Sequence, residues 1–193
     1  MKDPLYIEKK EVWYKQKKFL TIALGIFLIS IMVLSAVNLN TDAEEEVTYG
    51  GHTFVQTSFG WQTYLDSGQQ LFLTTNPEDL ASVFVPAVDF SRFSTLQKVY
   101  VGVNMYDDVQ PAVYDLQRDI SLPAQTDIAC YEDNDLCANY PLKTCEDASF
   151  TVGVIQLQQA NETLVQQKGN CLLIQGKDLL MLTDKLILDY YDA

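Results

Sequence analysis

The stretch that decides the architecture of this chain lies near its start. Residues 19–37 read Phe-Leu-Thr-Ile-Ala-Leu-Gly-Ile-Phe-Leu-Ile-Ser-Ile-Met-Val-Leu-Ser-Ala-Val, without a charged side chain. At a helical rise of about 1.5 Å per residue the run covers about 28 Å, close to the bilayer's hydrocarbon thickness of about 30 Å. The sequence therefore predicts a basic tail (1–18), a transmembrane helix (19–37), an acidic juxtamembrane linker (38–48) and a folded domain (49–193).

The charges on the two sides of the apolar run predict its orientation. Six lysines and three acids stand in residues 1–18, whereas four acids stand within residues 42–46 and the next basic residue is Arg92. Short lysine-rich flanks stay in the cytoplasm. We therefore expect a single-pass signal anchor in the cell membrane, with a cytoplasmic N-terminus and the domain outside. The glycosylation sequon Asn161-Glu162-Thr163 lies on the expected outer side.

Two other interpretations of the apolar run are open. A cleaved signal peptide has the same polarity, but the charged leader and the apolar run are both long for that role. Ser35 and Val37 also make a poor small-x-small cleavage pair. A buried core helix would need a partner surface on every side, and the lysine-rich prefix disfavours it. We adopt the uncleaved anchor.

The charge of the expected outer part excludes one class of partner. The whole chain of 193 residues has 13 basic and 26 acidic residues, and 7 basic and 23 acidic residues remain without the tail, a formal charge of −16. So acidic a surface repels phosphate backbones, and nucleic acid is not an expected partner. The expected partners are the membrane, through residues 19–37, and another membrane or envelope protein. About 150 residues suffice for one domain with its own core.

The four cysteines stand only in the expected outer part, at Cys130, Cys137, Cys145 and Cys171. An even number confined to that side indicates two disulfides. Three pairings are open, and we favour Cys130–Cys137, which closes a small acidic loop, with Cys145–Cys171, which ties this region to a later apolar strand. A zinc site is the alternative, but the chain has no Cys-x-x-Cys pair and a single histidine.

Hydrophobic periodicity in the domain predicts an α+β fold. The predicted strands are 52–56, 61–65, 69–74, 98–104, 150–158 and 170–175, and the predicted helices are a short one from Pro77, 110–120 and 177–191. Residues 127–147 are expected to form a loop. In the last helix the polar side is assigned to Asp178, Asp184, Lys185 and Asp189. We expect a mostly antiparallel sheet with two or three helices packed on one face.

No stretch of the chain carries a known catalytic motif. It lacks a phosphate loop, a dinucleotide-binding glycine motif, a Gly-x-Ser-x-Gly and a His-Glu-x-x-His, and we interpret His52 as an ordinary strand residue. We assign no catalytic residue and no cofactor, and an enzyme is the less favoured interpretation. Paired carboxylates for glycoside cleavage, such as Asp107 or Asp108 with Glu132, are compatible with the composition but follow no spacing rule.

The acidic cluster Glu132-Asp133-Asn134-Asp135 is the candidate for a cation site. Alternating carboxylates and an amide suit calcium, which takes six to eight oxygen ligands. The spacing departs from the calcium-loop pattern, because no glycine follows at the turning position and no glutamate completes it. Glu132, Asp133 and Asp135 are therefore calcium candidates, and a solvated loop between cysteines is the plainer alternative.

Aromatic residues are concentrated between residues 54 and 100. Most of them are expected to build the core, and any that project outward would form a docking surface for a protein or carbohydrate partner. The set comprises Phe59, Trp61, Tyr64, Phe72, Phe84, Phe90 and Phe93.

One resemblance extends over scattered short pieces of the chain. Asn170-Cys171-Leu172-Leu173-Ile174-Gln175-Gly176, followed by a helix with Thr183-Asp184-Lys185-Leu186-Ile187-Leu188, resembles the end of small archaeal single-pass membrane-anchored proteins of unknown function. A lysine-rich start, one membrane helix, a strand region with tryptophan and the turn Asn76-Pro77-Glu78 are similar as well. The resemblance implies an uncharacterised cell-surface domain and transfers no site residue.

These features predict a membrane-anchored extracytoplasmic protein that serves as an interaction or surface-assembly module. A ligand- or cation-binding sensor module is the alternative, and an envelope-polymer hydrolase with paired carboxylates is the less favoured one.

Overall fold

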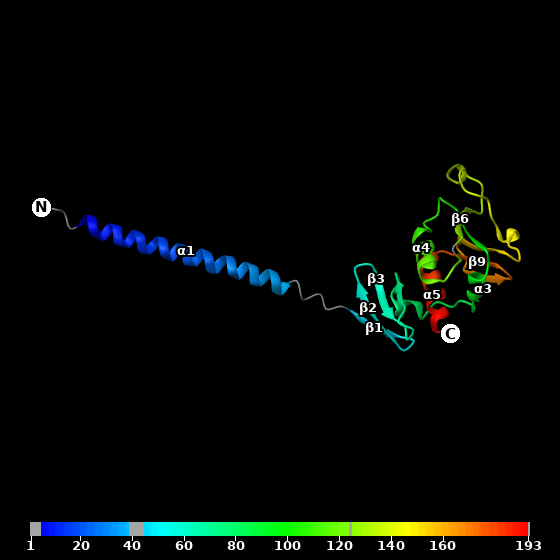
Figure 1. The fold of residues 1–193 in the computed structure, drawn as a ribbon, viewed down its shortest axis with the longest axis horizontal. Coiled ribbons are helices and arrows are strands. Elements are labelled where there is room, and N and C mark those ends of the chain that lie inside the picture. Colours follow the sequence, from blue (N-terminus) through cyan, green and yellow to red (C-terminus); the bar gives the residue numbers. More distant parts are fainter. Residues whose placement is uncertain (1–4, 39–44, 124, 193) are drawn as a thin grey trace. The chain divides into compact units, whose positions relative to one another are not determined.

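The computed structural model describes residues 5–38, 45–123 and 125–192, with side chains at 18–35, 45–123 and 125–191. The chain divides into two compact units, Met1–Glu44 and Glu45–Ala193. Figure 1 draws both units, and each is described by itself.

The described part of the first unit is the helix α1 (Leu5–Asn38), which is 34 residues long. Its segment Lys18–Ser35 has a mean hydropathy of 2.2 and buries none of its surface within the protein. Ser30 Oγ donates a hydrogen bond to the carbonyl of Ile26 at 2.9 Å, so this hydroxyl costs little in an apolar setting. The helix is thus long and apolar enough to span a membrane.

The second unit begins with a four-stranded antiparallel sheet in the order β1-β2-β3-β4. Its strands are β1 (Glu46–Tyr49), β2 (His52–Thr57), β3 (Gly60–Tyr64) and β4 (Gln70–Leu73). Gly50 and Gly51, with φ of 59° and 85°, make the tight turn between β1 and β2. Strand β1 starts inside the stretch expected to be a linker, because Val47 is buried and pairs with Phe54.

A second, five-stranded sheet has the order β6-β5-β7-β9-β8. Its strands are β5 (Lys98–Val103), β6 (Thr126–Cys130), β7 (Val152–Gln159), β8 (Leu164–Lys168) and β9 (Cys171–Gly176). All neighbours in this sheet are parallel except β8 and β9. The α+β class is confirmed, but the single, mostly antiparallel sheet is not: one sheet is antiparallel and the other is mixed.

The parallel strands arise because a helix connects β5 to β6. The helices of this unit are α2 (Pro77–Leu80), α3 (Ser91–Ser94), α4 (Gln110–Asp119) and α5 (Leu179–Asp192), with two short 3-10 turns, η1 (Asp135–Cys137) and η2 (Cys145–Asp147). Helix α4 carries the chain from β5 back to the start of β6, which makes the pair parallel. Strand β6 occupies part of the segment that was expected to be a loop.

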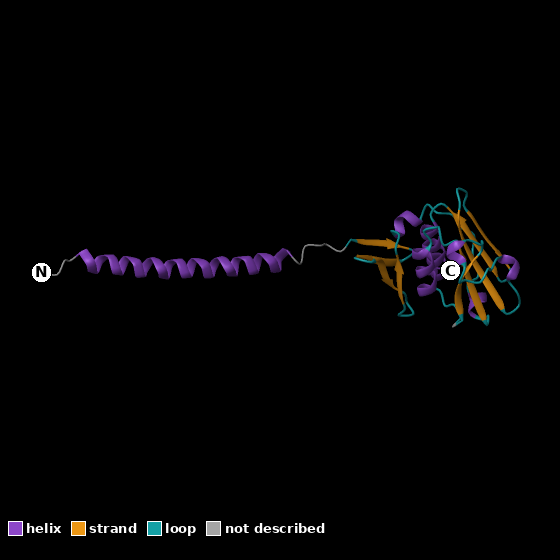
Figure 2. Ribbon diagram, turned by 90° about the horizontal axis from the view of Figure 1, so that it is seen from above, coloured by secondary structure: helices purple, strands orange, loops and turns teal. Residues whose placement is uncertain are grey.

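Helices α4 and α5 pack on each other and lie between the two sheets (Figure 2). The predicted apolar face of β5, with Val99, Val101 and Val103, is buried, and Ile155 on β7 and Leu172 on β9 pair into the same face. The expectation of helices on one face of one sheet is therefore corrected to a helical layer between two sheets. As a result, α5 is covered from two sides.

Candidate functional site

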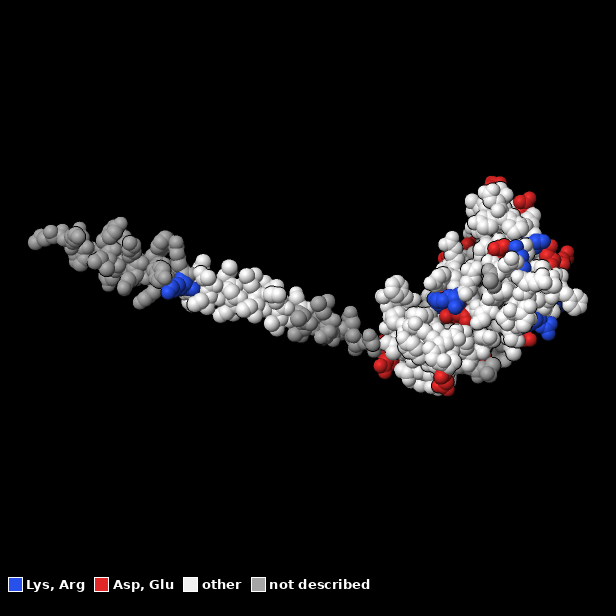
Figure 3. Space-filling view, viewed as in Figure 1, with Lys and Arg blue, Asp and Glu red and all other residues white. Residues whose placement is uncertain are grey.

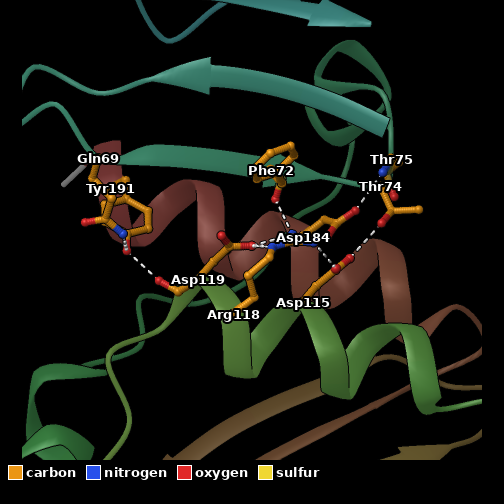
Figure 4. A network of polar contacts seen from close by, with 9 residues as sticks. All are labelled: Gln69, Phe72, Thr74, Thr75, Asp115, Arg118, Asp119, Asp184 and Tyr191. Carbon is orange, nitrogen blue, oxygen red and sulfur yellow. Dashed lines mark hydrogen bonds and ion pairs between the residues drawn. The ribbon is translucent and has the colours of Figure 1, made fainter. Parts of the chain in front are cut away.

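Strand β4 is an outer strand of the first sheet, and polar side chains of α4 and α5 bind along it. Arg118 Nη2 donates to the carbonyl of Phe72 at 2.7 Å, and the hydroxyl of Thr74 donates to Asp115 Oδ2 at 2.8 Å (Figure 4). Edge strands leave backbone groups that need partners. Here the helices supply those partners with side chains.

The contacts continue beyond both ends of β4. The backbone N–H of Thr75 donates to Asp184 Oδ2 at 2.7 Å, and at the other end Gln69 Nε2 donates to the hydroxyl of Tyr191 at 2.6 Å. That hydroxyl in turn donates to the carbonyl of Asp119. Residues 69–75 are thus fastened to both helices by a row of polar contacts, which we call the β4 seam (Figure 4).

Arg118 is the cation of the seam. Its Nη1 lies 2.9 Å from Asp115 Oδ1, and its Nε donates to Asp119 Oδ2 at 3.0 Å. Its guanidinium carbon lies 5.2 Å from the ring centre of Phe72 and 5.3 Å from that of Tyr114. Burial raises the pKa of Asp119, and the hydrogen bonds and charge of Arg118 oppose that rise. The guanidinium therefore binds two buried carboxylates, balances one of their two negative charges and lies close to two aromatic rings.

Asp184 on α5 is the second unusual acid. It is fully buried, its Oδ1 has no hydrogen-bond partner among the described residues, and neither has the buried hydroxyl of Thr183. Burial raises the pKa of Asp184 to about 7, the hydrogen bonds from Thr75 oppose the rise, and the neighbouring Asp115 adds to it. A carboxyl in this position is poised to hold a proton near neutral pH.

A pocket of about 360 Å³ opens beside the seam. Aromatic rings form much of its wall, and two of them are well exposed, Phe59 at 86% and Tyr114 at 64%. Ligand sites are commonly concave, largely apolar and furnished with a few fixed polar groups, and this pocket has that composition. Its lining residues are Phe59, Phe72, Thr74, Pro111, Tyr114, Asp115 and Arg118. We call it the aromatic pocket.

A wider and more open hollow of about 710 Å³ lies beside Cys145. Both charged residues in its lining, Arg92 and Lys168, are basic, and the exposed ring of Phe150 stands at its margin. Acidic side chains lie scattered over the face of the domain seen in Figure 3. The aromatic pocket is more enclosed and is lined by the buried Asp115 with its partner Arg118, so it is the better defined site.

The cysteines are paired as the sequence predicts. Cys130 pairs with Cys137, with Cα atoms 6.0 Å apart, and Cys145 pairs with Cys171, with Cα atoms 5.2 Å apart. The second pair links η2 to β9, a strand in the interior of the five-stranded sheet.

The calcium candidates Glu132, Asp133 and Asp135 are all exposed. Between them, Asn134 accepts a hydrogen bond from the Leu136 amide at 3.0 Å and caps η1. Among the residues that the structure describes, no three acidic, histidine or cysteine side chains are grouped to hold a metal ion. Calcium binding by this loop stays a prediction.

The other candidates from the sequence are dispersed. Asp107 accepts a hydrogen bond from the Tyr131 hydroxyl at 3.4 Å, and burial raises the pKa of Tyr131 to about 12. Asn161 is exposed between β7 and β8, as a glycosylation site requires, and His52 pairs with Tyr49 within the first sheet.

The aromatic set divides between core and surface. Trp61, Phe90 and Phe93 are buried, whereas Phe59, Tyr64 and Phe84 are exposed, and Phe72 is half-buried at the aromatic pocket. The expectation that most of them build the core is therefore wrong, because three of the seven are buried. Of the other four, Phe59 and Phe72 line the aromatic pocket, Tyr64 is an exposed ring at the end of β3, and Phe84 is an exposed ring on the loop after α2.

Sequence reasoning missed the buried acids. The helical pattern places Asp184 on the polar side of the last helix, but α5 packs between two layers, and this carboxyl is buried and binds Thr75 just after β4. Asp115 and Asp119 flank the buried Leu116 on α4. The signal that could have found them is the spacing Asp115, Arg118, Asp119, which places one cation next to two acids on one helix.

In comparisons with known proteins, no family model, no curated protein and no solved structure matches the chain.

Proposed function

We propose that this chain is a single-pass membrane protein that carries residues 45–193 outside the cell as a binding module, and that the aromatic pocket is its binding site. The apolar segment Lys18–Ser35 and the excess of lysine before it support the anchor and its orientation. The two disulfides support an oxidising location for the domain. The observation that carries the binding role is the pocket itself.

The ligand class follows from the charges around the pocket. Arg118 faces a ligand with a guanidinium that two carboxylates already neutralise. A cation in the pocket would meet Arg118, and an anion would meet Asp115, so neither gains a free counter-charge. A neutral group with apolar faces and hydroxyls suits aromatic walls and the donor and acceptor atoms of the Arg118–Asp115 pair. We infer that the ligand is a neutral sugar residue.

Saturation-transfer NMR on the full chain in detergent tests the binding role. The probes are glucose, galactose, mannose and N-acetylglucosamine as free sugars, each at about 10 mM, because single-sugar affinities of about 1 mM amount to only about 4 kcal/mol. Transfer to at least one sugar is expected in the wild type. The absence of saturation transfer to all four sugars would contradict the proposal.

A matched pair of variants locates the binding. Tyr114→Ala removes a pocket wall, and Tyr106→Ala removes a ring of equal exposure, 65% against 64%, that does not line the pocket. Loss of transfer in the first variant alone supports the site. Equal transfer in both variants places the sugar elsewhere. Soluble envelope polymer, added as competitor, distinguishes a polymer-bound sugar from a free one as the natural ligand.

A separate experiment tests the anchor. Membranes from cells expressing the chain are analysed by intact mass, because a cleaved signal peptide would remove residues 1–37. Retention of Lys2 and extraction only by detergent are expected. Protease added to intact cells should then degrade the domain while sparing the tail, and a protected domain would contradict the orientation.

A second candidate, contact with a membrane or envelope protein, has its own observation. Phe84 and Phe150 are 95% and 97% exposed, and large apolar rings exposed in this way are typical of surfaces that bind a partner. Photocrosslinking from a reactive residue at position 150, compared with one at the exposed Asp133, tests whether this ring marks a protein contact.

A further inference from the structure

Two carboxyl groups, one from each of the two packed helices α4 and α5, are buried next to each other. Asp115 on α4 and Asp184 on α5 are both excluded from solvent, and they interact with each other. They hold two consecutive residues after β4: Asp115 accepts from the Thr74 hydroxyl at 2.8 Å, and Asp184 accepts from the Thr75 amide at 2.7 Å (Figure 4). One corner of the chain therefore depends on both acids.

Within the described part of the chain, Arg118 is the cation that pairs with Asp115, and it is shared with a third acid. Arg118 binds Asp115 and Asp119. Lys185, next to Asp184 on α5, pairs with Asp189 at 2.7 Å and lies near Tyr49 of β1. Asp184 itself accepts from the Thr75 amide, and its helix α5 packs on β7 and β9 of the apolar core. Among the described residues, no lysine or arginine forms an ion pair with Asp184.

A proton on one of the two carboxyl groups removes the repulsion between them. A neutral Asp184 would carry its proton on Oδ1, the oxygen without a partner among the described residues, and would offer it to the neighbouring Asp115, while Oδ2 still accepts from the Thr75 amide. When the proton leaves for solvent water, both neighbouring buried carboxylates are charged, and Arg118 pairs with Asp115 and Asp119 but not with Asp184. Like charges in a dry setting repel strongly, and the structure relieves them by moving one group into water.

We propose that the Asp115–Asp184 pair is a proton-dependent latch: with a shared proton it holds Thr74 and Thr75 against α4 and α5, and loss of the proton releases this corner. Because Thr74 and Asp115 line the aromatic pocket, release changes the shape of the pocket. The link to ligand affinity rests on the proposed function, whereas the latch itself does not. Burial and the neighbouring acid raise the pKa of Asp184 to about 7, so the latch would respond near neutral pH.

Hydrogen exchange on the full chain in detergent tests the latch. The readout is the Thr75 amide, followed by mass spectrometry of a peptide over residues 70–80 at about pH 5.5 and about pH 8, with rates corrected for intrinsic exchange. We expect protection of Thr75 to fall about tenfold or more at the higher pH, since a group one unit above its pKa is about nine-tenths ionised. Equal protection at both pH values would overturn the proposal.

Variants separate the latch from general effects of pH. Asp184→Asn keeps a carbonyl for the Thr75 amide but cannot ionise, so its protection should be the same at both pH values. Asp133→Asn changes an exposed acid and should keep the wild-type response. A pH response retained in Asp184→Asn overturns the latch. Should that variant not fold, Asp115→Asn is the substitute, with the same expectation.

The outcome stays separate from that of the proposed function. Sugar binding is measured on the same samples at both pH values. A pH-dependent Thr75 amide without sugar binding supports the latch and contradicts the binding role. Sugar binding with a pH-independent Thr75 amide supports the binding role and overturns the latch.

Discussion

Arg118 on α4 donates from Nη2 to the backbone carbonyl of Phe72 at 2.7 Å, so a side chain takes the place that a fifth strand would occupy beside β4. The same guanidinium holds Asp115 and Asp119. This arrangement closes the edge of the four-stranded sheet against the helical layer, and an exposed edge would otherwise offer a template for pairing with another chain.

Arg118→Met should destabilise the domain by about 3–5 kcal/mol, because it leaves two buried carboxylates without their cation. Urea unfolding of the full chain in detergent, followed by near-ultraviolet circular dichroism, measures the change. The control is Arg92→Met. Arg92 and its partner Asp89 are both about half exposed and 3.8 Å apart, so the cost should stay within about 1 kcal/mol. Equal costs for the two variants would show that the seam does not carry stability.

Asp184 should make the domain less stable as pH rises. Its pKa is raised to about 7 in the folded state, against about 3.9 in an unfolded chain, so the folded state binds more protons between these values. The contribution of this group is therefore fully present below about pH 4 and is lost as pH rises to about 7. The total is a few kcal/mol, on the order of 1.4 kcal/mol per pKa unit.

The measurement compares wild type with Asp184→Asn over this pH range. As pH rises, the unfolding free energy of the wild type should fall relative to that of Asp184→Asn. An unchanged difference between about pH 5 and about pH 8 would mean that Asp184 titrates normally.

The two disulfides should differ in what they contribute. Cys145–Cys171 joins residues that are 26 positions apart in the sequence, and Cys130–Cys137 joins residues that are 7 positions apart. Loop-closure entropy predicts about 3–4 kcal/mol for the longer loop and about 2–3 kcal/mol for the shorter one. Double Cys→Ser variants of each pair, compared by denaturant midpoint, test the order. A larger loss from the shorter loop would point to strain or denatured-state structure instead.

Gly60 and Gly68 form a matched pair for backbone strain. Both have positive φ, 128° and 80°, but a Cβ at Gly60 would also meet the carbonyl oxygen of Leu73, whereas a Cβ at Gly68 meets open space. Gly68→Ala should cost about 1–2 kcal/mol and Gly60→Ala about 3 kcal/mol or more. Thermal unfolding of the two variants decides, and equal melting temperatures would refute the packing argument at Gly60.

Local patterns in the sequence were sufficient for the elements that form from local interactions. The uncharged run, the alternating valines of β5 and the Pro-initiated helix α4 each carry their own signal, and the structure has all three. The pairing of the cysteines also followed, because Cys130–Cys137 is a short loop and Cys171 stands in an apolar strand.

The sheet order could not be predicted in the same way. Strand β6 is five residues long and pairs with β5 across α4, and β7 then pairs on the other side of β5. Nothing in the local sequence of Thr126–Cys130 distinguishes this strand from a loop. The seam was missed for a related reason: the helical wheel of α5 assumes one covered side, whereas two sheets enclose this helix.

The position of α5 also bears on biogenesis. Helix α5 follows all nine strands along the described chain and covers the two sheets together with α4, so neither sheet has its full cover until residues 179–192 have been synthesised. A premature stop before residue 179 would expose apolar surface on both sheets at once. Cellular proteases should remove copies of the chain that lack α5 with little delay.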